Sequence, residues 1–171
     1  KQISSIEKNN KHNLEIFNES VKNDHIVNFI EGHKSHGKIR NPIVILKDGT
    51  YLMHCEPDII CILCEKSYKR ILEFEDKIQK KITFYGKKCP TGEFYIYSSN
   101  CKGLSIHQII TGFYGHGRGT KNGSVDHIDR NPLNNRLDNL RIATHEEQLQ
   151  NSSGIMPGTK RNRQRNAQEL P

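Results

Sequence analysis

The chain has 171 residues, of which 26 are Lys or Arg and 19 are Asp or Glu, so its formal net charge is +7. Only 33% of the residues are hydrophobic and Trp is absent, which excludes a large aromatic core. No apolar stretch approaches the roughly 20 residues of a bilayer span, and the positive charge suits a polyanionic partner. Five Cys, an odd number, fit free thiols or a metal better than a disulfide framework. We therefore expect no membrane partner and an intracellular, reducing compartment.

Residues 1–40 are rich in Asn, Lys and Glu, and their apolar residues are too sparse for an independent core. This composition predicts a polar, loosely ordered arm with one short helix near residues 24–31. Residues 41–103 form the next unit, a small α+β region.

The α+β region begins with a predicted hairpin. Apolar runs at 43–46 and 51–53 flank a Lys-Asp-Gly-Thr turn, in which Asp-Gly supplies a positive φ. Apolar residues at near-helical spacing then predict a helix from Asp58, its cap, to Glu75. Two short strands are expected at 82–85 and 94–97.

Residues 104–151 hold the most informative stretch. A predicted helix over 104–114 precedes four linked motifs: Val-Asp-His-Ile-Asp (125–129), Asn-Pro-Leu-Asn-Asn-Arg (131–136), Asp-Asn-Leu-Arg (138–141) and Thr-His-Glu-Glu (144–147). This order predicts a strand, a loop, a returning strand and a Thr-capped helix. Residues 152–171 are basic and almost without apolar residues, which indicates a flexible tail.

These motifs resemble the HNH nuclease family, also called ββα-metal nucleases, and the Ile-His-Gln-Ile helix at 106–109 extends the resemblance. It implies an α+β fold ending in a ββα-metal hairpin and helix. By resemblance His127 is the general base, Asp126 is a metal ligand for Mg²⁺ or Mn²⁺, and Asn139 ties the two hairpin strands together. These roles suit phosphodiester hydrolysis, which needs a base to deprotonate water and a cation to neutralise charge.

The third family residue is a departure from the pattern. An Asn or His in the last helix aligns here with Gln148, whose amide oxygen can still coordinate a metal. His145 and Asn151 lie at three-residue spacing on either side of Gln148, so either could take its place.

Basic residues surround the motif and continue into the tail, as expected of a protein that grips phosphates. The predicted DNA contacts are Arg118, Lys121, Arg130, Arg136, Arg141, Lys160, Arg161, Arg163 and Arg165. Cys61 and Cys64 could hold a structural Zn²⁺, although their spacing also fits one face of an amphipathic helix, where Cys behaves as a small hydrophobe.

The sequence thus predicts a metal-dependent HNH endonuclease that acts on double-stranded DNA as a monomer or weak homodimer. The Lys-, Asn- and Ile-rich composition is similar to that of homing-type HNH proteins of large DNA viruses. The alternative is a DNA-binding module that keeps the hairpin and has lost cleavage, which the departure at Gln148 leaves open.

Overall fold

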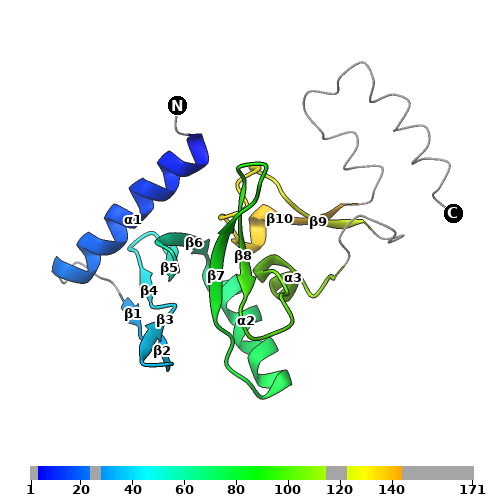
Figure 1. Ribbon diagram of the computed structural model, residues 1–171, viewed down its shortest axis with the longest axis horizontal. Coiled ribbons are helices and arrows are strands. Elements are labelled where there is room, and N and C mark those ends of the chain that lie inside the picture. The colour runs from blue at the N-terminus through cyan, green and yellow to red at the C-terminus, as the bar shows by residue number, and fades with distance from the viewer. Residues whose placement is uncertain (1–3, 24–27, 115–122, 144–171) are drawn as a thin grey trace, which may run out of the picture.

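The computed structural model describes residues 4–23, 28–114 and 123–143, and it is a mixed α and β structure (Figure 1). The helices are α1 (Ser5–Asn23), α2 (Glu65–Ile78) and α3 (Ile106–Thr111), with a single 3-10 turn, η1 (Leu137–Asn139), in these ranges. The strands are β1 (Asn28–Ile30), β2 (His33–Ser35), β3 (Lys38–Arg40), β4 (Ile43–Ile45), β5 (Tyr51–Cys55), β6 (Ile59–Leu63), β7 (Phe84–Lys88), β8 (Phe94–Ser98), β9 (Ser124–His127) and β10 (Leu140–Ala143). No helix in the described ranges is long and apolar enough to cross a bilayer.

A four-stranded sheet in the order β1-β4-β5-β6 organises the core, and all its neighbouring strands are antiparallel. Because side chains alternate along a strand, the sheet has two buried faces. Val44, Leu52 and Ile60 pack with Phe17 of α1 on one face. Figure 1 shows α1 lying along β4, β5 and β6.

The other face of the sheet carries the larger core. Met53 and Cys61 of the sheet pack there with Ile71 of α2, Ile96 of β8 and Ile110 of α3. The strand predicted at 94–97 is confirmed as β8, and the strand predicted at 82–85 is found as β7 but shifted to 84–88; the two form their own antiparallel hairpin. The helix predicted over 104–114 is confirmed but shorter, because Gly112 adopts a left-handed φ of 72° and ends α3.

The prediction of a short helix near residues 24–31 was wrong. Residues 28–30 form β1, and the helix of this region is instead α1, which occupies 19 residues that we expected to be loosely ordered. Phe17 of α1 is buried against the sheet, and Leu14 and Ile16 pack beside it. Asn10 adds a polar link, because its Oδ1 accepts from the Ile60 N–H (2.8 Å) and its Nδ2 donates to the Asp58 carbonyl (3.2 Å).

The prediction of a helix starting at Asp58 was also wrong for its first turn and a half. Residues 59–63 form strand β6, and α2 begins only at Glu65, after Cys64 as its N-cap. A short apolar run does not distinguish a strand from a buried helix. Ile60 and Cys61 point to opposite faces of the sheet and both are fully buried. The continuous apolar run is therefore that of a strand covered on both faces.

The last described segment is the β9–β10 hairpin, with Leu140 opposite His127 and Arg141 opposite Asp126. Its connecting loop docks on β6: the Ile62 N–H donates to the Leu133 carbonyl (2.8 Å) and the Asn135 N–H to the Ile62 carbonyl (2.7 Å). The loop therefore covers the free edge of the sheet. The helix predicted after residue 143 and the tail at 152–171 lie outside the described residues.

Candidate functional site

His127, the last residue of β9, is buried, and its ring is held by a residue that the sequence analysis did not single out. The Nε2 atom of His127 lies 2.9 Å from Oδ1 of Asn135. Asn135 is itself fully buried, and its Nδ2 donates to the Pro132 carbonyl (3.1 Å) and to Sγ of Cys61 (3.4 Å). With the amide nitrogen used in this way, Oδ1 can only accept from His127. The proton of the neutral imidazole therefore sits on Nε2, and Nδ1 carries the lone pair.

His107 of α3 packs against the same imidazole. The two ring centroids are 5.1 Å apart and the rings meet edge to face at 84°. Nε2 of His107 lies 3.0 Å from Oγ of Ser105, which positions the second ring in turn. Burial, and then the neighbouring His127, lower the pKa of His107 to about 3.

The pKa of His127 is also lowered. Burial is the largest cause and outweighs the hydrogen bond to Asn135 and the charges of Asp129 and Asp126, which raise the pKa. Both imidazoles are therefore neutral at pH 7, which is the state in which a histidine can accept a proton.

Asn139, in η1, is buried and makes three side-chain hydrogen bonds. Its Oδ1 accepts from the Asp129 N–H (3.0 Å), and its Nδ2 donates to Oδ1 of Asp129 and to the Asn134 carbonyl (both 2.8 Å). Its own carbonyl accepts from the Ile128 N–H (2.9 Å). These bonds join the turn after β9 to the start of β10, so the contacts of Asn139 support an orienting role for this residue.

Asp126 lies on β9 beside His127 and points to the opposite face of the hairpin. Its Oδ2 is 3.3 Å from Nη2 of Arg141, directly across the pair of strands, and both side chains are partly exposed (37% and 41%). The Nε of Arg141 is buried and has no hydrogen-bond partner among the described residues.

The donor at Asp126 fits a hard divalent cation, because a carboxylate oxygen is the kind of ligand that Mg²⁺ and Mn²⁺ prefer. Within the ranges that the structure describes, no group of three or more His, Cys, Asp or Glu residues lies close enough to hold a metal. The residue predicted as a metal ligand at the third motif position, Gln148, and its alternatives, His145 and Asn151, lie outside these ranges.

The predicted DNA-contacting residues are dispersed. Nη1 of Arg136 donates to Oγ1 of Thr50 (3.2 Å), which links it to the turn of the β4–β5 hairpin. Its Nε lies 3.6 Å from Oδ1 of Asp138. Arg130 is exposed in the loop after β9, and Arg141 pairs with Asp126. The remaining predicted contacts lie outside the described residues: Arg118, Lys121, Lys160, Arg161, Arg163 and Arg165.

Cys61 and Cys64 have separate surroundings. Cys61 is fully buried in β6, and burial raises its pKa to about 12, which keeps it a thiol. Burial also raises the pKa of Cys64, but hydrogen bonds from Ser67 and from the Leu137 backbone outweigh it and leave the pKa lowered. Each sulfur is thus occupied by a protein hydrogen bond.

Asn135 and the packing of His107 on His127 are features of the candidate site that the motifs did not predict. The only signal for Asn135 was its place in the Asn-Asn pair of the loop, where a turn-forming role is the ordinary interpretation.

Residues 108–150 match the model of the HNH endonuclease family. The matched region spans about a quarter of the chain, from α3 through the β9–β10 hairpin. No match was found among curated proteins or among solved structures. This region is therefore similar to HNH endonucleases, which supports a nuclease-type function with DNA as substrate.

Proposed function

We propose that this protein is a metal-dependent HNH-type endonuclease that hydrolyses phosphodiester bonds of double-stranded DNA. The observation that carries the proposal is the neutral His127, whose Nε2–H is bound by Asn135 within the region similar to HNH endonucleases. Asp126, the preceding residue of the strand, offers the carboxylate for the cation.

The proposed role of His127 is to take a proton from the attacking water. Since Nε2–H donates to Asn135, Nδ1 is the atom that accepts this proton. The resulting imidazolium would be stabilised by the Asn135 oxygen and by the negative charges of Asp129 and Asp126, which raise the pKa of His127. His107 and Asn135 touch the ring from two directions and restrict its rotation.

Asp126 is the proposed metal ligand, with Gln148, or His145 or Asn151 in its place, as the second. A divalent cation bound there would supply a Lewis acid for the charge on the scissile phosphate. Arg141 bonds the Asp126 carboxylate across the hairpin. Its guanidinium, which forms strong hydrogen bonds to phosphate, therefore lies beside that carboxylate.

The same ion pair favours a second candidate function, a DNA-binding module without cleavage. With Arg141 bonded to it, Asp126 has its charge balanced without a cation. In that case the guanidinium of Arg141 would contact phosphate and no metal would be required for binding.

One pair of assays separates the two functions. Nicking of a supercoiled plasmid is measured with Mg²⁺ or Mn²⁺ and with EDTA, and binding to a duplex is measured in EDTA. His127→Ala is expected to reduce cleavage by roughly 10²–10⁴, the contribution of a positioned base, and to retain binding. His12→Ala, an exposed change on α1, is the control and should cut like the parent.

A parent protein that binds the duplex and cuts with neither cation would overturn the endonuclease and favour the binding module. The homing-type character is part of the proposal, and it predicts one long, defined site when cleavage is mapped on a random-sequence DNA library.

A further inference from the structure

Strands β2 and β3 form a two-stranded ribbon, residues 33–40, that stands apart from the candidate site. They pair antiparallel with His33 opposite Arg40, Lys34 opposite Ile39 and Ser35 opposite Lys38. His36 and Gly37 make the turn, both at positive φ (52° and 76°), a combination that matches the twist of a tight hairpin. None of the eight residues is buried. In Figure 1 the ribbon lies at the lower left and β9 and β10 lie to the right.

The ribbon is cationic along its whole length. Lys34, Lys38 and Arg40 carry positive charge, residues 33–40 contain no acidic residue, and none of these three cations forms an ion pair with a described residue. Ile39 is 67% exposed in the middle of this charge, where it contributes nothing to the core. A cationic ribbon that exposes one apolar side chain is suited to a partner that is anionic and also offers apolar groups.

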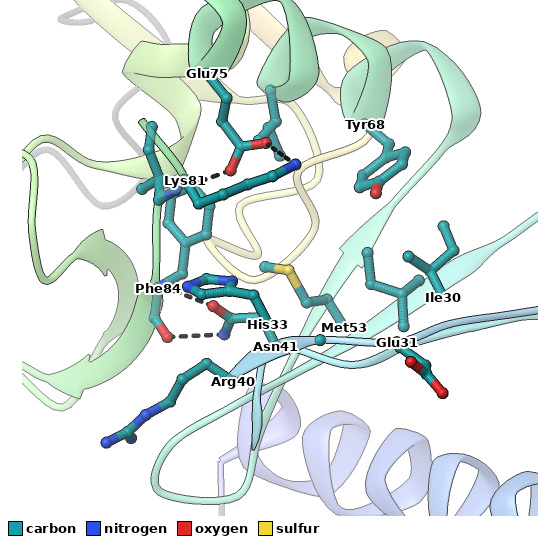
Figure 2. A pocket seen from close by; sticks show the side chains of 14 residues that line it. Ile30, Glu31, His33, Arg40, Asn41, Met53, Tyr68, Glu75, Lys81 and Phe84 are labelled. Carbon is teal, nitrogen blue, oxygen red and sulfur yellow. Dashed lines mark hydrogen bonds and ion pairs between the residues drawn. The ribbon is translucent and has the colours of Figure 1, made fainter. Parts of the chain in front are cut away.

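The base of the ribbon is held in one place. A Cβ at Gly32 would lie 1.9 Å from the Arg40 carbonyl oxygen, so the two ends of the ribbon approach as closely as the backbone allows. Asn41 follows at φ 55°, and its side chain bonds both backbone groups of Phe84 on β7, accepting at 2.8 Å and donating at 2.9 Å (Figure 2). A third bond, from Asn41 to the His54 carbonyl (3.1 Å), ties the same point to β5.

Building on the proposed function, we propose that this ribbon lies in the major groove of the DNA substrate and is a second DNA-binding element. The major groove admits a two-stranded β-ribbon. Lys34 and Ile39 are paired across the ribbon, so they share one face, and Lys38 and Arg40 lie on the other. The face with Ile39 meets the base edges, where a thymine methyl is an apolar partner, and Lys38 and Arg40 reach the phosphates at the edges of the groove. Because Asn41 fixes the base of the ribbon, little freedom is lost on binding.

The test compares two triple variants of the full chain that remove the same charge. In the ribbon, Lys34, Lys38 and Arg40 are each replaced by Ala. In the matched control, Lys66, Arg70 and Lys77, which are exposed on α2 and in no ion pair with a described residue, are each replaced by Ala. Binding to a labelled random-sequence duplex is measured in EDTA over a salt series, so that cleavage does not enter.

We expect the ribbon variant to bind about tenfold more weakly at physiological salt. Its log–log salt slope should become shallower by about 0.9 for each phosphate that the variant no longer neutralises. The α2 variant should change much less. Ile39→Thr, which keeps a β-branched side chain, should weaken binding several-fold and leave the salt slope unchanged.

Equal reductions in the two triple variants would overturn the proposal, because the effect would then be one of net charge alone. A ribbon variant that binds like a DNA-binding parent would overturn it and leave the endonuclease intact. A parent that does not bind duplex DNA would overturn both. Unchanged binding by Ile39→Thr would place the ribbon outside the groove and contradict the geometry proposed.

Discussion

His127 ends β9 and Asn135 lies eight residues later in the loop that follows, and Nε2 of the first is 2.9 Å from Oδ1 of the second. Asn135 also donates its backbone N–H to Ile62 and its side-chain N–H to Cys61, both on β6. The candidate base is thus positioned by the edge of the central sheet. Residues of the N-terminal half of the chain therefore help to position a motif that lies entirely in the C-terminal half of the sequence.

Replacing Asn135 by Asp is expected to move the acidic limb of the pH–rate profile to higher pH. A carboxylate within hydrogen-bond distance favours the imidazolium, so the pKa of His127 rises and less neutral base remains at a given acidic pH. Cleavage rates across a pH series measure this shift. Asn135→Leu, which removes the acceptor without adding charge, should lower cleavage about tenfold or more without this shift. A profile unchanged by Asn135→Asp would refute the contact.

Asn139→Ala is expected to destabilise the fold by about 1–3 kcal/mol, because it leaves the Asp129 N–H and the Asn134 carbonyl without their buried partner. Urea unfolding gives the free energy. Asn9→Ala, an exposed change on α1 with one side-chain partner, is the control and should change stability by less than about 0.5 kcal/mol. Equal stability of the two variants would show that Asn139 does not hold the loop.

His107 should make the protein sensitive to acid. Its pKa is lowered to about 3 in the folded state, whereas an unfolded histidine titrates near 6.5. Between these values the unfolded chain binds a proton that the folded chain does not, so the free energy of unfolding falls as the pH drops from about 6.5 toward 3.

His107→Phe keeps an aromatic ring and removes this titration. Between pH 7 and pH 4, the stability of the parent should fall by about 3 kcal/mol more than that of the variant, at about 1.4 kcal/mol for each pKa unit. Urea unfolding at the two pH values gives both decreases, and the carboxylates titrate in both proteins and cancel. Equal decreases would mean that the folded protein does not lower the pKa of His107.

The second metal ligand, at the third position of the motif, can be assigned by substitution. If Gln148 coordinates the cation, Gln148→Asn retains cleavage and Gln148→Leu abolishes it. If His145 coordinates instead, Gln148→Leu is tolerated, His145→Ala is not, and the metal preference moves toward softer transition ions, which imidazole suits better than Mg²⁺. Plasmid nicking with Mg²⁺, Mn²⁺ and Co²⁺ distinguishes these patterns. Full activity of both variants would leave Asp126 as the only protein ligand assigned.

Local patterns were sufficient where the governing interactions are close in sequence. The β4–β5 turn follows from Asp-Gly, where Gly49 takes a φ of 89°, and β7 and β8 follow from short apolar runs around a turn. The Asp-His and Asn-Leu motifs placed Asp126 and Asn139 on the two sides of one hairpin, because strand and turn preferences act over a few residues.

Tertiary contacts decided the rest. Residues 59–63 are a strand and not a helix because β5 and the two covering layers bury both of their faces, which no local pattern records. Residues 5–23 form a helix because its few apolar side chains, above all Phe17, pack on one face of the sheet. By itself the sequence determined that a histidine, an aspartate and an asparagine of an HNH-like motif share a hairpin. Only the folded chain decided that Asn135, bonded to β6, would hold the proton of His127 on Nε2, because that bond joins groups from distant parts of the chain.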